Sequence, residues 1–189
     1  MLELENLNVG KFHAYAAIYL IGEKHLGRRR LAEELGLTES KTRTMLKHLK
    51  NSGYIQTGDK TRLTSEGEKI LSEIQERLQK VSEADLGYLG MGEEAVAALV
   101  KLEEDFNVIQ LRDEAVRAGA RGLTVLEHQK NFTFPEDEDP EEERFKKDTE
   151  LLEEIFAPEK GDKLLISSGD SEEDARKGLW RALHHLLQR

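Results

Sequence analysis

The first part of the chain alternates between stretches with apolar side chains at helical spacing and turns marked by glycine. Over residues 39–52, for example, apolar positions recur every three to four residues, which predicts a helix with one buried face. Thr38 precedes this stretch and is expected to cap the helix. Gly27, Gly36 and Gly53 are expected to end helices. In chain order the pattern predicts helices over 11–25, 28–36 and 39–52, extended segments at 54–57 and 62–64, and a further helix from 65.

A short helix, a tight turn and a second helix with basic residues on its outer face are typical of a helix-turn-helix. The two extended segments that follow are joined by Gly58-Asp59-Lys60-Thr61, which favours a hairpin turn and hence a wing. Lys and Arg donate to guanine edges and phosphates, and Ser and Thr bond to either kind of group. The residues expected to contact DNA are Arg29, Arg30, Ser40, Lys41, Arg43, Thr44, Lys47, His48, Lys60 and Arg62.

The helix from residue 65 is expected to continue to about residue 84 as a linker helix. Its apolar positions Ile70, Ile74, Leu78 and Val81 form a narrow stripe near the spacing of paired helices. One interpretation is a homodimer formed through this helix, and the other is packing on the first helix of the same domain. The glycines between residues 85 and 92 predict the connection to a second domain.

The second half of the chain has a different pattern, in which short apolar stretches alternate with amphipathic ones. The order predicts a small α/β domain with a mixed sheet covered by helices. Its expected strands are 94–102, 123–129, 131–134 and 163–167, and its expected helices are 109–120, 141–156 and 170–188. The fold class is therefore α+β or α/β, with a winged helix-turn-helix domain over 1–84 and an α/β domain over 93–189.

The net charge of −10 is unevenly distributed. Residues 1–80 carry 14 Lys and Arg against 11 Asp and Glu, whereas the rest of the chain carries 14 against 27. Such asymmetry indicates two modules with different partners, and the positive charge of the first module is suited to binding nucleic acid. The sequence has no run of 18 apolar residues, no secretory signal pattern and no Cys, so we expect a cytoplasmic protein without membrane span or disulfides.

Two resemblances to known families follow from these residues. The phrase from Arg30 to Tyr54 resembles archaeal winged-helix transcription regulators. The phrases 112–122, 132–135 and 161–166 resemble an archaeal domain family of unknown function that occurs fused behind a winged helix. The first resemblance implies DNA binding, and the second implies that the stretch after residue 93 is a strand. The second family supplies no activity or ligand.

The second domain offers one candidate ligand site. Arg112, Arg117 and Arg121 surround a helix end and the Gly119 turn, and three cations in an acidic domain are expected to hold a phosphate or carboxylate metabolite. The alternative is that Arg112 and Arg117 pair with Asp113, Glu114 or the acidic helix nearby, and that Gly119 only ends the helix. The loop after residue 167 suggests a phosphate site, but acids fill the first turn of the following helix, which favours capping by Ser171.

The sequence therefore predicts a DNA-binding transcriptional regulator rather than an enzyme. Its expected partners are duplex DNA, a second copy of the chain and an anionic small-molecule effector. No catalytic residue or cofactor is predicted, because the sequence shows no Gly-rich nucleotide cradle and no activated nucleophile. No metal site is predicted, because the His residues lack a second ligand at helical spacing. One alternative is an enzyme of small-molecule metabolism with a fused winged helix, as in archaeal riboflavin kinases, although the tyrosine- and glycine-rich phrases of that kinase are missing. A protein-interaction adaptor is the other.

Overall fold

The computed structural model describes residues 11–58, 60–91, 94–102, 106–135, 140 and 142–187. The chain forms two compact units, one of Met1–Gln75 with Leu187–Arg189 and one of Glu76–Leu186. The turn residue Asp59 lies outside the described residues.

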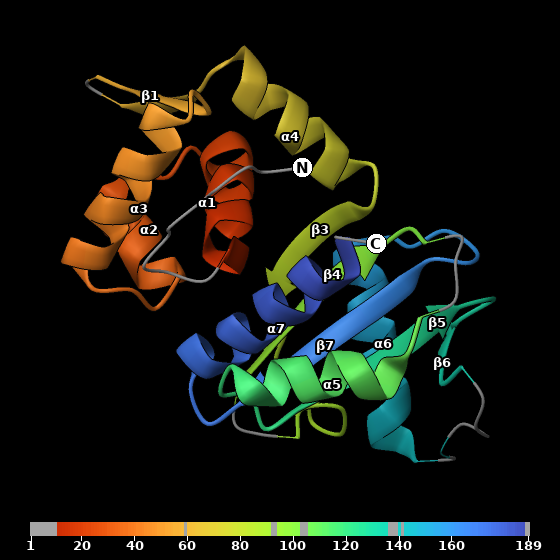
Figure 1. The fold of residues 1–189 in the computed structure, drawn as a ribbon. Coiled ribbons are helices and arrows are strands. Elements are labelled where there is room, and N and C mark those ends of the chain that lie inside the picture. Colours follow the sequence, from red (N-terminus) through yellow and green to blue (C-terminus); the bar gives the residue numbers. More distant parts are fainter. Residues whose placement is uncertain are drawn as a thin grey trace. The chain divides into compact units, whose positions relative to one another are not determined.

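The first unit has the element order of a winged helix-turn-helix (Figure 1). Its elements are α1 Lys11–Lys24, α2 Arg28–Glu34, α3 Glu39–Asn51, β1 Ile55–Thr57, β2 Thr61–Leu63 and α4 Ser65–Gln75. Strands β1 and β2 pair antiparallel, with Gln56 opposite Arg62. Helix α1 packs against α4 and β2, and α2 packs against α3. The winged-helix part of the predicted fold class is confirmed.

Helices α2 and α3 begin and end largely as the sequence predicts. The Thr38 side chain accepts a hydrogen bond from the backbone N–H of Lys41 at 3.3 Å and so caps α3. Gly36 and Gly53 follow α2 and α3 with φ of 58° and 79°, which glycine adopts without strain. The end of α1 differs, because His25 rather than Gly27 takes the left-handed conformation, with φ of 50°.

The predicted linker helix is wrong beyond Gln75. Helix α4 ends there, and residues Leu78–Glu83 form strand β3 at the edge of the sheet of the second unit. Leu78 and Val81 pair with Val100 and Ala98 of the neighbouring strand, so they belong to a ladder and not to a helical stripe. The first unit therefore ends near residue 75, not 84, and the described structure provides no paired-helix seam over this segment.

The second unit is an antiparallel sheet with helices on both faces. Its elements after β3 are β4 Glu94–Val100, α5 Val108–Arg117, β5 Gly122–His128, β6 Phe132–Thr133, α6 Glu143–Phe156, β7 Lys163–Gly169 and α7 Glu172–Leu187. The strand order is β3-β4-β7-β5-β6, and each pairing is antiparallel. The α/β domain is confirmed, but its sheet is antiparallel where a mixed sheet was predicted.

Alternate residues of the central strands face opposite helical layers. Leu164 and Ile166 of β7 belong to the core beneath α6, together with Phe145 and Leu152 of that helix. Ser167 points to the other face, where a Cβ added to Gly178 of α7 would lie 2.6 Å from its Oγ. Figure 1 shows the same arrangement, with α5 and α7 in front of the sheet and α6 behind it.

The glycine-rich segment between β3 and β4 is part of the second unit and not a connection between domains. Leu86 and Leu89 lie in the core beneath α6. The buried carboxylate of Asp148 accepts hydrogen bonds from the backbone N–H groups of Gly87, Tyr88 and Leu89 at 2.9, 2.8 and 2.8 Å. This loop is therefore fixed to helix α6 by charge-assisted hydrogen bonds.

Candidate nucleic-acid interface

Helix α3 separates its apolar and basic residues onto opposite sides. Thr42, Met45, Leu46 and Leu49 are buried, as predicted. Between these positions the cationic side chains point outward, and Lys41, Arg43, Lys47 and Lys50 are exposed. A helix held by its apolar side and basic on its outer side has the form needed to enter a major groove.

The outward cations of α3 have no carboxylate partner among the residues that the structure describes. Within the part of the chain that the structure describes, Lys41, Arg43 and Lys47 have no recorded ion pair. The Lys50 ammonium instead donates to the hydroxyl of Thr57 on β1, at 2.9 Å. Uncompensated positive charge on an exposed helix attracts phosphate.

Of the other three α3 residues predicted to contact DNA, Thr44 and His48 are less free to contact a ligand than Ser40. The Thr44 hydroxyl donates to the carbonyl oxygen of Ser40 at 3.0 Å, so it completes a hydrogen bond within the helix. Ser40 itself is exposed, whereas Thr44 and His48 are half-buried.

The arginines of α2 differ from the cations of α3 because they lie beside an acid. Arg29 Nε donates to Glu33 Oε1 at 3.2 Å, and Arg30 Nε lies 4.0 Å from Glu33 Oε2. All three side chains are more than half exposed. Such surface pairs are weak, so a phosphate can compete for these two arginines.

The hairpin is fixed to the end of α3 and the start of α4. The Thr64 hydroxyl donates to the carbonyl oxygen of Gly53 at 2.5 Å and accepts from the backbone N–H of Gly67 at 3.2 Å. Gly67 is required by the packing, because a Cβ there would lie 2.1 Å from the carbonyl oxygen of Tyr54. The wing is thereby positioned against α3.

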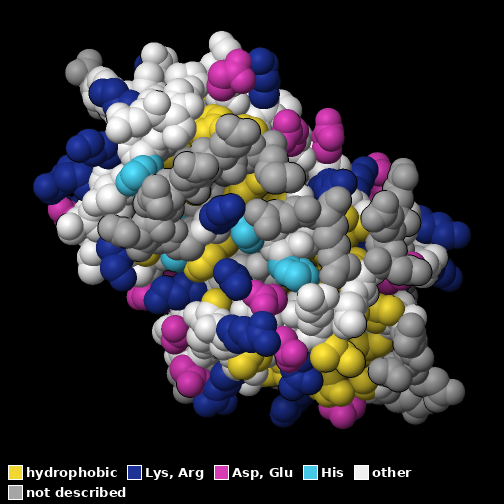
Figure 2. Space-filling view, viewed as in Figure 1, with side chains coloured by type: hydrophobic (Ala, Val, Ile, Leu, Met, Phe, Trp, Pro, Cys, Tyr) yellow, Lys and Arg dark blue, Asp and Glu magenta, His cyan; other side chains and the backbone are white. Residues whose placement is uncertain are grey.

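The wing carries exposed Lys60 and Arg62, which line two grooves of this unit. One, of about 270 Å³, is also lined by Gln56, Thr57 and Gly58. The other, of about 400 Å³, extends to His25 at the end of α1. Figure 2 shows Lys and Arg side chains along the edge of this unit formed by its helices and hairpin.

The structure does not gather the three arginines predicted to hold an anion. Arg117 is paired with Glu114, with Nη1 and Oε1 2.5 Å apart, and Arg121 is paired with Asp170. Arg112 is exposed on α5 and, being five positions from Arg117, lies about 140° away around the helix. Gly119, with φ of 112°, follows the end of α5. The salt-bridge interpretation therefore holds for Arg117, and an effector bound here stays a prediction.

Glu114 is a buried acid that sequence reasoning placed only as a local partner of arginine. Its Oε2 also accepts from Arg181 Nε of α7 at 2.6 Å. Burial would raise the pKa of this carboxyl, but the guanidinium groups of Arg181 and Arg117 outweigh burial and hold the pKa below its usual range. No local signal identifies Arg181, which is 67 positions further along the chain.

The side chains of the loop between β7 and α7 form hydrogen bonds with one another at the start of α7. The Ser171 hydroxyl accepts from the backbone N–H of Asp174 at 3.2 Å and donates to the Asp174 carboxylate at 2.7 Å. This is the capping predicted for Ser171.

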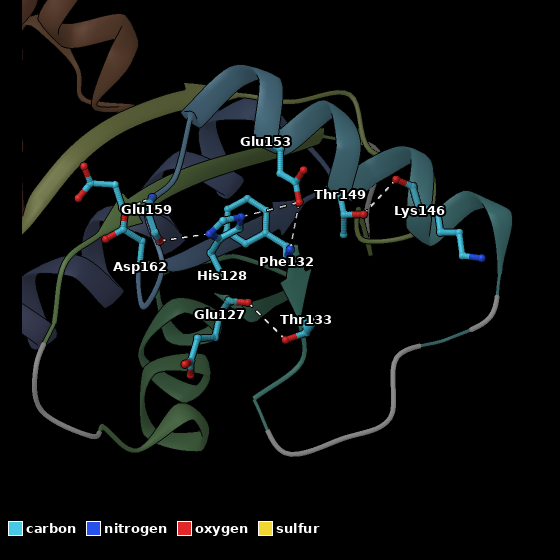
Figure 3. A network of polar contacts seen from close by, with 9 residues as sticks. All are labelled: Glu127, His128, Phe132, Thr133, Lys146, Thr149, Glu153, Glu159 and Asp162. Carbon is cyan, nitrogen blue, oxygen red and sulfur yellow. Dashed lines mark hydrogen bonds and ion pairs between the residues drawn. The ribbon is translucent and has the colours of Figure 1, made fainter. Parts of the chain in front are cut away.

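A polar cluster at the β5–β6 end of the second unit was not predicted (Figure 3). His128 Nδ1 lies 3.2 Å from the carbonyl oxygen of Glu159, and its Nε2 lies 4.0 Å from Glu153 Oε1. The same Glu153 oxygen accepts from the backbone N–H of Phe132, and buried Asp162 accepts from that of Glu159. These groups contact one another, so the cluster fixes the hairpin to α6.

Among the described residues no three His, Cys, Asp or Glu side chains lie together in a way that would hold a metal ion. None of the helices described has the length and apolarity needed to cross a membrane.

The chain therefore combines two kinds of domain, a winged helix-turn-helix and an antiparallel sheet covered by helices. Residues 91–186 match the model of a domain of unknown function, DUF4443, and the chain belongs to this family. Residues 15–78 match the CggR N-terminal DNA binding domain. None of the curated proteins matches the chain.

Among solved structures, the chain is similar to "Hypothetical protein PH0730 from Pyrococcus horikoshii OT3". The TM-score is 0.74 and the identity 24%, over 96% of this chain and 94% of that one. At this identity the similarity shows the fold alone.

Proposed function

We propose that this protein is a DNA-binding transcriptional regulator whose winged helix reads duplex DNA. The observation that carries the proposal is the set of exposed cations on α3, Lys41, Arg43 and Lys47, which have no recorded carboxylate partner in the described structure. The match of residues 15–78 to a DNA-binding domain supports the same ligand.

In this proposal α3 enters the major groove while the wing contacts the backbone. Lys41, Arg43 and Lys47 donate to base edges or phosphates. Ser40, Thr44 and His48 join them where the DNA backbone lies close to the helix. The flanking phosphates are contacted by Lys60 and Arg62 of the wing and by Arg29 and Arg30 of α2. The acidic second unit holds an effector or a second copy, and thereby favours one arrangement of two recognition helices.

Selection of genomic fragments by the full chain tests DNA binding. We expect enrichment of a duplex sequence, and loss of most affinity for it in a variant with Arg43→Ala and Lys47→Ala, measured by fluorescence anisotropy. Lys69→Ala is the matched control, since Lys69 is an exposed cation of α4 already paired with Glu66 at 2.7 Å. Binding that is insensitive to loss of Arg43 and Lys47 contradicts the contact assignment.

The effector role of the second unit has a separate test. A small molecule from native extract that binds the folded chain raises its melting temperature. Loss of that shift in a variant with Arg112→Ala and Arg121→Ala would support the predicted anion site. An unchanged melting temperature across fractions favours dimerisation as the role of this unit.

A further inference from the structure

The larger groove beside the wing lies between three elements of the first unit. Its volume is about 400 Å³, and its lining comes from the end of α1, the hairpin residues 60–63 and the first turn of α4. Gly22 lets α1 approach the other two elements, because a Cβ there would lie 2.3 Å from Leu71 Cδ2 and 3.1 Å from Leu63 Cδ1. Buried Ile21 and Leu63 contribute the apolar part of the lining. The groove is therefore a fixed feature of the folded unit.

The exposed charged side chains of this groove are mainly basic. They are His25 of α1, Lys60 and Arg62 of the hairpin and Glu68 of α4. Within the described residues, Lys60 and Arg62 have no recorded carboxylate partner. Glu68 lies in the first turn of its helix, where the helix dipole favours a carboxylate. The groove carries one excess positive charge with His25 neutral and two with His25 protonated, so it is suited to an anion.

The hydrogen bond of the His25 ring decides which nitrogen can bind a ligand. Nδ1 lies 3.3 Å from the carbonyl oxygen of Ile21, and because a carbonyl only accepts, Nδ1 carries the hydrogen. In the neutral ring Nε2 then has no hydrogen and cannot donate to an anion. The protonated ring donates from both nitrogens. Glu23 and Lys24, the charged neighbours of His25 on α1, are exposed and are not among the residues that line the groove.

His25 lies between two sets of cations that the proposed function places on DNA phosphates. Lys60 and Arg62 of the wing line the same groove, and Arg29 and Arg30 follow four and five positions later in the first turn of α2. A ligand phosphate in the groove is therefore close to the path expected for the DNA backbone.

We propose that the groove binds a phosphate of the DNA backbone, with protonated His25 as a third cationic contact beside Lys60 and Arg62. The inference rests on the proposed function and adds a pH dependence to it. Because only the protonated ring donates from Nε2, DNA binding takes up a proton. Duplex affinity therefore rises as pH falls through the range in which imidazole changes charge.

Duplex affinity at two pH values tests the inference. Fluorescence anisotropy of the full chain with its selected duplex is measured at about pH 6 and about pH 8, at equal ionic strength. We expect about fivefold higher affinity at the lower pH. The slope of log affinity against log salt concentration should be larger there by about 1, because protonated His25 displaces one more counterion. Equal affinities and equal slopes at the two pH values overturn the proposal.

Substitutions of His25 separate its charge from its shape. The residue has φ of 50°, which Asn also adopts readily, so His25→Asn keeps the backbone and stays neutral. We expect this variant to bind duplex equally at both pH values. His25→Lys stays charged and should bind at the higher pH about as tightly as wild type does at the lower one. Circular dichroism melting verifies that both variants are folded.

His48 of α3 is the other histidine among the residues proposed to contact DNA, so its variant shows which ring is responsible. His48→Gln is expected to keep the fivefold change between the two pH values. A change that is lost in His48→Gln and kept in His25→Asn contradicts the assignment to His25.

Nuclear magnetic resonance of the His25 ring separates this inference from the proposed function. The ring signal is identified by its absence from the His25→Asn spectrum, and its titration midpoint should move to higher pH when duplex is added. Inorganic phosphate is the second probe. A chain that binds no duplex but shows this movement with phosphate supports the phosphate site and overturns its assignment to DNA. A midpoint that neither probe moves overturns the site itself.

Discussion

Glu114 on α5 and Arg181 on α7 connect the two helices that cover one face of the sheet. Glu114 Oε2 lies 2.6 Å from Arg181 Nε, and the Glu114 side chain is only 11% exposed. Arg117 binds the other carboxylate oxygen at 2.5 Å. Removing this carboxylate takes away the acid that the two guanidinium groups share.

We predict that Glu114→Gln lowers the free energy of unfolding of the second unit by about 2 kcal/mol at neutral pH. Because the folded pKa of Glu114 lies below its unfolded value, the pair stabilises fully above the ordinary carboxyl range. That stabilisation is lost as pH falls through the lowered folded value. Melting curves of both proteins should therefore converge in strong acid, and a difference that grows toward low pH contradicts the sign.

The hydrogen bonds from the 87–89 backbone to Asp148 lead to a second prediction. Asp148→Asn keeps the shape but replaces one carboxylate oxygen with an NH₂ group that faces backbone N–H donors. We expect a loss of roughly 3 kcal/mol in chemical denaturation. Glu150→Gln on the exposed side of the same helix is the control and should change stability little. Equal effects of the two changes would show that the hydrogen bonds between Asp148 and the 87–89 backbone do not contribute specially to stability.

Gly67 gives a prediction for the winged-helix unit. Gly67→Ala places a Cβ 2.1 Å from the Tyr54 carbonyl oxygen, and a backbone atom cannot move aside as a side chain can. Destabilisation by about 3 kcal/mol is expected. Gly58→Ala, where a Cβ meets nothing within 4 Å, should stay within about 0.5 kcal/mol of wild type. Comparable melting temperatures for the two variants would refute the packing argument.

The elements predicted well are those whose sequence pattern and final packing agree. Over 39–52 the apolar spacing, the Thr38 cap and Gly53 all indicate the same helix, and the structure contains it. The segment after Gln75 shows the opposite case. Leu78 and Val81 continue the helical spacing of Ile70 and Ile74, but pairing with β4 decides their conformation. Long-range strand pairing of this kind overrides local periodicity.

The candidate sites show the same division between local and distant information. The exposed side of α3 follows from the buried side, so its cations were predicted from spacing alone. The partners of the second-unit arginines include Asp170 and Glu114, and the buried Glu114 also binds Arg181 from a helix distant in sequence. No spacing rule indicates that pair, nor the contact of His128 with Glu153 and Glu159.

The salt dependence of DNA affinity tests the central claim most directly. If Lys47 neutralises a phosphate, the slope of log affinity against log salt concentration should fall in magnitude by about 1 in Lys47→Ala, because one fewer counterion is released. Lys69→Ala should leave the wild-type slope unchanged. A Lys47→Ala slope equal to that of wild type, or wild-type binding that does not depend on salt, would contradict a duplex interface on α3.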